Sequence, residues 1–244
     1  MSWPLLKYFI KKNWWIVAAL TAFIMFELVV TIAMFDLIKD MDFLGLGGTT
    51  VQEFTISALP SLLFMFTMLF YILIIYFIIV RPIDTTSMSS HLASGIRREK
   101  YLTSAFVFLA VSLLSIFVVI FVICGLLMLI WVKVDWAEWL YANVTVFTGC
   151  LAVASISFFF ASVFPSHVVG KLGMIGLPVL FLILFMMYAQ FPNTLEFFRW
   201  ITPFGWINIM NSSLWWMWNL IYLAVTGAFI TASVFLFKKK QLSI

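Results

Sequence analysis

Residues 82–101, PIDTTSMSSHLASGIRREKY, form the longest polar interval in a chain that is otherwise almost entirely apolar. They join two hydrophobic segments that are each long enough to cross a bilayer. Asp84 or Thr85 can cap a short helix here, because its side-chain oxygen can accept unpaired backbone N–H groups. Met88 and Leu92 are four residues apart, so they share one face of that helix. The pattern predicts a short helix between two membrane spans.

The second half of this interval holds a glycine and then a basic cluster. Gly95 can adopt the left-handed conformation that closes a helix. Arg97, Arg98 and Lys100 follow, as expected at the cytoplasmic end of a span. Two interpretations are open. The segment is either a helix that offers an apolar face to another protein, or an ordinary loop with a solvated run of charges.

Composition places the chain in the membrane class. It has 244 residues, of which 65% are hydrophobic and 10% are charged, whereas a soluble globular chain carries roughly 25% charged residues. Its mean hydropathy is +1.15. The net charge of +4 does not indicate nucleic-acid binding, because the basic residues lie at the ends of the apolar runs. Cys124 and Cys150 lie inside apolar segments, which argues against a disulfide framework or a metal site.

The apolar runs predict an all-α membrane protein with one transmembrane domain, 1–244. Residues 3–13 mix apolar side chains with lysines, so we expect an interfacial helix with its lysines toward anionic lipid. A span needs about 20 apolar residues. Six runs are long enough, at 14–38, 59–80, 103–131, 141–164, 172–190 and 214–237.

The distribution of charge predicts the orientation. One side of the membrane receives eleven of the 14 basic residues: Lys7, Lys11, Lys12, Arg81, Arg97, Arg98, Lys100, Lys171, Lys238, Lys239 and Lys240. Basic residues concentrate on the cytoplasmic side of membrane proteins. We therefore expect a multi-pass protein of the cell membrane with both termini in the cytoplasm. On the outer side, Asn143-Val-Thr145 and Asn211-Ser-Ser213 are glycosylation sequons, which matter only in a eukaryotic secretory pathway.

Two further stretches suggest special helix geometry. Residues 191–213 lie on the outer side yet are rich in aromatic side chains, which predicts short re-entrant helices or an aromatic belt at the interface. Glycines at 170, 173 and 176 allow close helix packing. Pro178 follows them, so helix packing and a broken helix near a translocation path are both open interpretations.

Residues suited to catalysis are lacking, so we expect no enzyme activity in this chain. No P-loop motif is present, and no nucleophile–base pair or HExxH motif occurs. Glu27 lies well inside a predicted span, where carboxyl groups are rare and costly. It is either part of a translocation pathway or a neutral acid that bonds a neighbouring helix or Thr31, one turn away.

Two segments resemble the type-2 ABC transporter permeases. The run DTTSMSSHLASGIRREKYLTSAF, at 84–106, is similar to their loop between the second and third spans, which holds a cytoplasmic coupling helix. The run RWITPFGWINIM, at 199–210, is similar to the segment before their last span. Gly95 stands where many members of that family have proline.

The resemblance implies a permease subunit of a bacterial exporter. Asp84, Thr85, Met88, Leu92, Gly95, Arg97 and Arg98 would form the ATPase-coupling helix. Thr202, Pro203 and Phe204 would belong to an extracellular gate. The chain would bind no cofactor itself, since ATP and Mg would be held by a partner ATPase. A second permease, identical or related, would complete the pathway.

The substrate class follows from the same resemblance. Compact permeases of this kind export amphipathic or antimicrobial peptides, and the chain looks like a permease of the phenol-soluble modulin exporters. Two alternatives are a permease for a lipid or a drug, and a non-pumping immunity protein that binds a peptide. An intramembrane enzyme is a third class, and it would need a reactive pair that the sequence lacks.

The predicted orientation can be tested by labelling intact cells with a thiol reagent that does not cross membranes. Cysteines introduced at Gly47 and Thr194 should react, because both positions are predicted to lie outside. A cysteine introduced at Ser89 should react only after the cells are opened. Labelling of Ser89 in sealed cells would contradict the orientation.

Overall fold

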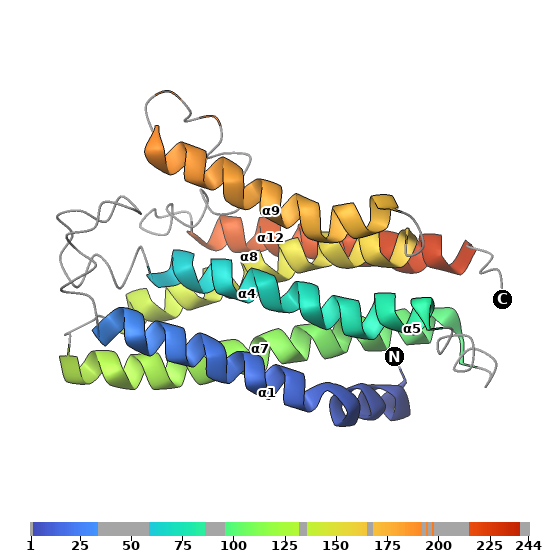
Figure 1. Cartoon of the computed structure of the whole chain (residues 1–244), viewed down its shortest axis with the longest axis horizontal. Helices are drawn as coiled ribbons and strands as arrows, with labels where there is room; N and C mark the ends of the chain where they lie inside the picture. The colour runs from blue at the N-terminus through green and yellow to red at the C-terminus, as the bar shows by residue number, and fades with distance from the viewer. Residues whose placement is uncertain are drawn as a thin grey trace.

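The protein is a bundle of long helices (Figure 1). The computed structural model describes residues 2–33, 59–85, 96–131, 136–164, 168–191, 194, 197 and 215–239. Within these ranges the regular structure is entirely helical. The elements are α1 (Trp3–Ala33), α4 (Leu59–Ile75), the π-helix η3 (Tyr76–Val80), α5 (Arg81–Asp84), α7 (Arg98–Trp131), α8 (Trp136–Val163), α9 (Val168–Gln190) and α12 (Trp215–Lys239). The prediction of an all-α fold is confirmed for these residues.

Membrane character is also evident in the structure. In the described ranges, 5 segments are long and apolar enough to cross a bilayer: Trp3–Val30, Leu63–Asp84, Arg98–Ile123, Trp139–Val163 and Trp216–Lys239. The apolar part of α9, Val168–Leu184, is shorter, so the sixth span stays a prediction. Helix α9 continues through Pro178, so the described helix is not broken there.

The first helix corrects one expectation. Residues 3–13 and the first span were expected as two elements, but α1 is one continuous helix of 31 residues. Nothing in it interrupts the backbone hydrogen bonds, since Pro4 sits in the first turn, where no donor is required. At 1.5 Å per residue the helix is about 46 Å long, more than the roughly 30 Å of a hydrocarbon core. Its first turns bury Leu5, Leu6 and Phe9.

Helix α8 is the centre of the bundle. It packs against α4, α7, α9 and α12, whereas α1 packs against α4 and α7. At Gly149, a methyl group would lie 3.2 Å from the Phe64 ring of α4 and 3.7 Å from the Tyr222 ring of α12. The missing side chain therefore lets three helices meet closely. All three run in the same direction in Figure 1.

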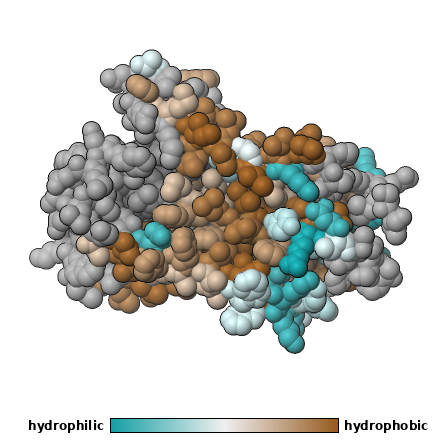
Figure 2. All heavy atoms as spheres, in the orientation of Figure 1, coloured by the Kyte–Doolittle hydropathy of each residue, from teal (hydrophilic) through white to brown (hydrophobic). Residues whose placement is uncertain are grey.

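The two ends of the bundle differ in polarity. Helix α1 begins, α5 lies and α12 ends at the same end of the bundle (Figure 1). Hydrophobic side chains cover the middle of the visible face, and hydrophilic ones gather toward that end (Figure 2). An apolar middle is what lipid tails require, because they cannot solvate polar groups.

Glycines bring α8 and α9 into close contact. A Cβ atom on Gly173 would lie 2.4 Å from ring atoms of Phe160, and one on Gly170 would lie 1.8 Å from the carbonyl oxygen of Phe164. No described atom lies within 4 Å of the corresponding point on Gly176. The predicted role in helix packing is therefore confirmed for Gly173, whereas Gly170 packs against Phe164, the residue that directly follows α8.

We predict that Gly173→Ala lowers the thermal unfolding temperature of the detergent-purified protein. The added methyl group must displace the Phe160 ring, and overpacking of this kind costs about 1–3 kcal/mol. Gly176→Ala is the matched control, since it adds the same group to the same helix in open space. Alanine is also the better helix former there, so its midpoint should stay level or rise. Equal midpoints for the two variants would contradict this account of the packing.

Candidate functional site

The strongest candidate site is the end of the bundle that flanks residues 86–95. Of the residues predicted to form the coupling helix, Asp84, Thr85, Arg97 and Arg98 are described. The other three, Met88, Leu92 and Gly95, lie outside the described residues, so the predicted helix itself is not tested. The structure describes the two arms of this segment. The incoming arm is residues 76–85, which form η3, α5 and Thr85, and the outgoing arm is residues 96–104, which lead into α7.

The incoming arm continues the helix past its predicted end at residue 80. The backbone N–H of Arg81 donates to the carbonyl oxygen of Tyr76, five residues earlier, as in a π-helix. Single π-turns occur often at functional sites. Helix α5 follows and holds Pro82 in its first turn. A helix can therefore cross this proline only with an altered pattern of hydrogen bonds.

The outgoing arm supplies a hydrogen bond at this irregular turn. The hydroxyl of Tyr101, in α7, donates to the carbonyl oxygen of Ile78 at 3.0 Å. Ile78 lies four residues before Pro82, whose nitrogen carries no hydrogen to donate. Both Tyr101 and Ile78 are buried, where an unpaired carbonyl group is costly. One side chain thus joins the two arms at the point where the helix is weakest.

Thr85 ends the incoming arm. Its backbone N–H donates to the carbonyl oxygen of Arg81 at 2.9 Å, and its hydroxyl donates to the same oxygen at 2.8 Å. Thr85 and Asp84 were expected at the start of a new helix. The structure places Asp84 in the last turn of α5 and Thr85 directly after it, so these contacts close the preceding helix. The N-cap itself stays a prediction, because residues 86–95 lie outside the described residues.

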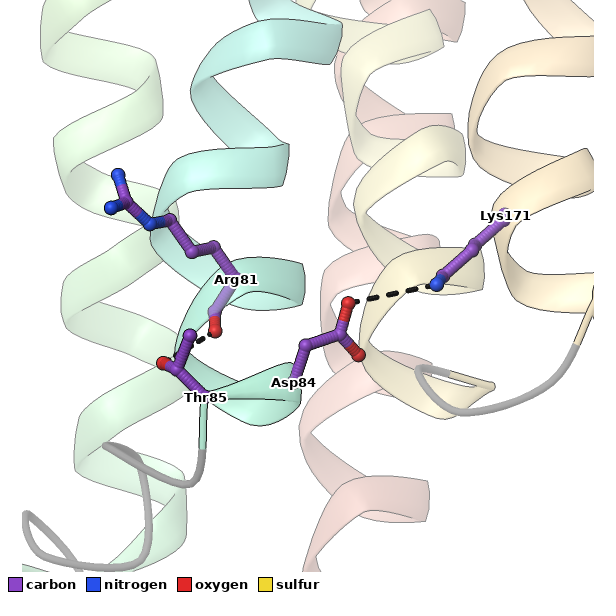
Figure 3. A network of polar contacts seen from close by, with 4 residues as sticks. All are labelled: Arg81, Asp84, Thr85 and Lys171. Atoms are coloured by element: carbon purple, nitrogen blue, oxygen red, sulfur yellow. Dashed lines mark hydrogen bonds and ion pairs between the residues drawn. The ribbon is translucent and has the colours of Figure 1, made fainter.

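Each arm also forms an ion pair with another helix. Asp84 pairs with Lys171 of α9 at 3.6 Å, and Figure 3 shows the two side chains reaching toward each other across the end of the bundle. On the other arm, Glu99 of α7 pairs with Lys238 of α12 at 2.8 Å. All four side chains are substantially exposed. Exposed pairs contribute roughly 0–1 kcal/mol, so they orient the arms more than they stabilise the fold.

The start of α1 contacts the outgoing arm through a hydrogen bond and a pair of aromatic rings. The backbone nitrogen of Ser2 donates to the hydroxyl of Ser104 at 2.9 Å. The Phe9 ring meets the Tyr101 ring edge-on, with 5.5 Å between centroids. Tyr101 is therefore held from two sides, by α1 and by the incoming arm.

The basic side chains of this end are positioned for a membrane interface. Lys12, Arg81 and Lys239 each lie over an aromatic ring of their own helix, on Tyr8, Phe77 and Phe235 respectively. Aromatic and basic side chains are typical of the headgroup region. In addition, Arg97 and Lys100 at the start of the outgoing arm are exposed. The arrangement suits anionic lipid or an acidic protein surface.

The structure describes little of the two other predicted sites, the translocation pathway and the extracellular gate. Glu27 is half-buried on α1, so its carboxyl group is not fully turned toward lipid, and the side chain of Thr31 is not described. Thr202, Pro203 and Phe204 lie outside the described residues. The translocation and gate roles of these five residues stay predictions.

The sequence analysis missed a polar network between α8 and α12. The hydroxyl of Thr148 donates to Oδ1 of Asn219, and Nδ2 of Asn219 donates to the Thr145 hydroxyl at 3.2 Å. Asn143 is buried and donates to the carbonyl oxygen of Trp139 at 2.8 Å. The glycosylation reading of Asn143 is therefore wrong for the folded chain. Polar residues at 143, 145 and 148 within an apolar run were the signal for helix contact.

Among the described residues, no group of three His, Cys, Asp or Glu side chains could hold a metal ion. No protein-family model, curated protein or solved structure matches the chain.

We predict that Tyr101→Phe loosens the junction between the two arms. The variant keeps the ring beside Phe9 but removes the donor to Ile78, and a buried carbonyl left unpaired costs about 1–3 kcal/mol. Amide hydrogen exchange should accelerate at residues 78–84, and the unfolding temperature should fall.

Tyr141→Phe is the control, because it removes a phenolic hydroxyl from an exposed side chain on another helix, α8. Unchanged exchange at residues 78–84 in Tyr101→Phe would show that the hydroxyl does not hold this turn.

Proposed function

We propose that this chain is the membrane-spanning permease subunit of an ATP-driven ABC exporter. It would span the cell membrane six times with both termini in the cytoplasm. A separate cytoplasmic ATPase would bind and hydrolyse ATP with Mg. A second permease subunit, identical or related, would complete the pathway for an amphipathic or antimicrobial peptide such as a phenol-soluble modulin.

One observation carries this proposal, namely that residues 86–95 are flanked by two arms tied to different helices. The incoming arm reaches α9 through Asp84 and Lys171, and the outgoing arm reaches α12 through Glu99. An ordinary loop between spans needs no such ties. A segment that receives force from a partner needs contacts with more than one span.

The geometry supports a route for that force. A push on residues 86–95 would act on α5 and on the first turn of α7 together, because Tyr101 bonds Ile78 across the two arms. The exposed ion pairs to α9 and α12 are too weak to transmit this push, so it would pass mainly along α5 and α7. Helices are stiff along their axes, so a displacement at this end would reach the far end of the bundle. The proposal assigns the gate to Thr202, Pro203 and Phe204, which lie outside the described residues.

The proposed substrate class rests on composition, which is less specific than the contacts that support the coupling role. The chain has 28 Phe and 13 Met, and flexible or aromatic apolar side chains suit varied apolar partners. Glu27 and Thr31 would provide a polar point on the pathway of a cationic amphipathic peptide. Lipid and drug substrates would meet the same apolar lining, so substrate identity is decided by transport assays.

The proposal predicts that Met88 and Leu92 bind the ATPase. Burial of an apolar side chain contributes roughly 1.5–3 kcal/mol, and an aspartate in its place adds the cost of desolvating a charge. The double variant Met88→Asp, Leu92→Asp should therefore lose its ATPase during gentle-detergent purification and should lose export. Its abundance in the membrane should be normal, since the changes lie between spans.

The double variant Ser89→Asp, Ser90→Asp is the matched control, because it adds the same charge to the same segment and keeps both apolar side chains. It should retain the ATPase. If the Met88 and Leu92 variant keeps both partner and export, the coupling role fails. If no ATPase accompanies even the unmodified chain, the non-pumping immunity protein becomes the better explanation.

A further inference from the structure

The first half of α1 carries an exposed row of two lysines and a tryptophan. Lys7, Lys11 and Trp14 follow one another at intervals of four and three residues, so they share one face of the helix. All three side chains are exposed, and Trp14 is 62% accessible. The other side of the helix is buried against the bundle, and it holds Leu5, Leu6, Phe9, Asn13 and Ile16. We call the three exposed residues the α1 stripe.

The lysines of the α1 stripe have no carboxylate partner among the described residues. The described ion pairs engage other lysines, in α9 and α12, and the amine of Lys12 donates to the Tyr8 hydroxyl at 2.9 Å. No acidic residue precedes Glu27 in the chain. Lys7 and Lys11 are one turn apart, so their like charges repel each other. An anion between them would offset this repulsion.

The length of α1 places the stripe at the depth of the lipid headgroups. From Trp14 to Ala33 the helix rises about 30 Å, which is the thickness of a hydrocarbon core. Trp14 then lies at the boundary of the core, where tryptophan is enriched. Lys11 and Lys7 lie about 5 and 10 Å beyond it along the axis. Long lysine side chains can reach the phosphate level from both positions.

We propose that the α1 stripe is a binding site for an anionic phospholipid, with the lipid phosphate between Lys7 and Lys11. Ammonium groups donate strong hydrogen bonds to phosphate oxygens. The indole of Trp14 would lie beside the upper part of an acyl chain, since it has an apolar body and a polar N–H. A zwitterionic lipid brings its own cation next to the phosphate, so it neutralises the two lysines less well.

The apolar side chains beside the lysines favour a lipid over an acidic protein. Ile10 is 41% exposed, next to Lys11, and Trp14 follows one turn later. An acidic protein in water would leave these apolar groups solvated, whereas a lipid covers them with its acyl chains. The predicted orientation also puts this end of the bundle at the cytoplasmic leaflet, where anionic lipids attract basic segments.

The site would anchor the helix that contacts the outgoing arm. Ser2 bonds Ser104, and the Phe9 ring meets Tyr101. A lipid held on the exposed side of α1 would therefore fix the start of this helix at the membrane surface while its buried side contacts α7. The inference requires only that α1 crosses the membrane, so it does not rest on the proposed exporter function.

Native mass spectrometry of the full-length protein in detergent tests the site. Phosphatidylglycerol and phosphatidylcholine are titrated separately, and the affinity for the first bound lipid is measured. The unmodified chain should prefer phosphatidylglycerol. The double variant Lys7→Gln, Lys11→Gln should bind phosphatidylglycerol roughly tenfold more weakly, because each lysine contributes to binding of an anionic lipid. Its affinity for phosphatidylcholine should not change. The double variant Lys7→Arg, Lys11→Arg keeps the charge and should keep the preference.

The double variant Lys171→Gln, Lys238→Gln is the matched control. It removes the same charge from the same end of the bundle, but its lysines are paired with Asp84 and Glu99. It should keep most of the affinity for phosphatidylglycerol. Equal losses in the two glutamine variants would show that binding follows net charge alone, and the site assignment would be wrong. Unchanged lipid affinity in the Lys7 and Lys11 variant, with loss of a co-purified acidic protein, would assign the stripe to a protein partner instead.

Discussion

A bilayer offers no hydrogen-bond partner to a peptide group, and this constraint shapes the bundle. Every carbonyl and N–H in the hydrocarbon must be paired within the protein. Long helices achieve this along most of the chain. Within the described residues, Pro82 and Pro178 lack the N–H that this pairing needs. Before Pro82 the helix passes through a π-turn, and the Tyr101 hydroxyl donates to the carbonyl oxygen of Ile78. The bond from Tyr101 to Ile78 therefore connects α7 to the helix that continues from α4.

The same constraint explains why the buried polar side chains differ in kind. Most hydroxyls in the bundle bond their own helix, and Thr148 and Asn219 bond across α8 and α12. Interhelical polar bonds hold membrane helices together where lipid provides no hydrophobic driving force. On the α4 side, the Tyr71 hydroxyl lies close to Ser157 of α8. Helix α8 therefore carries polar side chains toward both α4 and α12.

Helix α8 holds α4 and α12 in different ways. Gly149 lets both helices pack closely against α8, and polar bonds join α8 to α12. Helix α4 leads through η3 and α5 into the polar segment. Weak, exposed ion pairs connect that segment to α9 and α12. A transporter needs a firm scaffold and a part that responds to its motor, and this arrangement supports the proposal of an exporter permease.

The sequence alone determined the helical class and the membrane character, because long apolar runs have few other stable structures. It also identified Gly173 as a packing point, since a glycine between apolar residues marks a place where helices can approach closely. The sequence could not determine partners that are far apart along the chain. The bond between Tyr101 and Ile78, the pairing of Asp84 with Lys171, and the burial of Asn143 all depend on which helix faces meet. In an apolar helix the hydrophobic pattern is nearly uniform around the axis, so it does not specify those faces, and only the tertiary structure decides them.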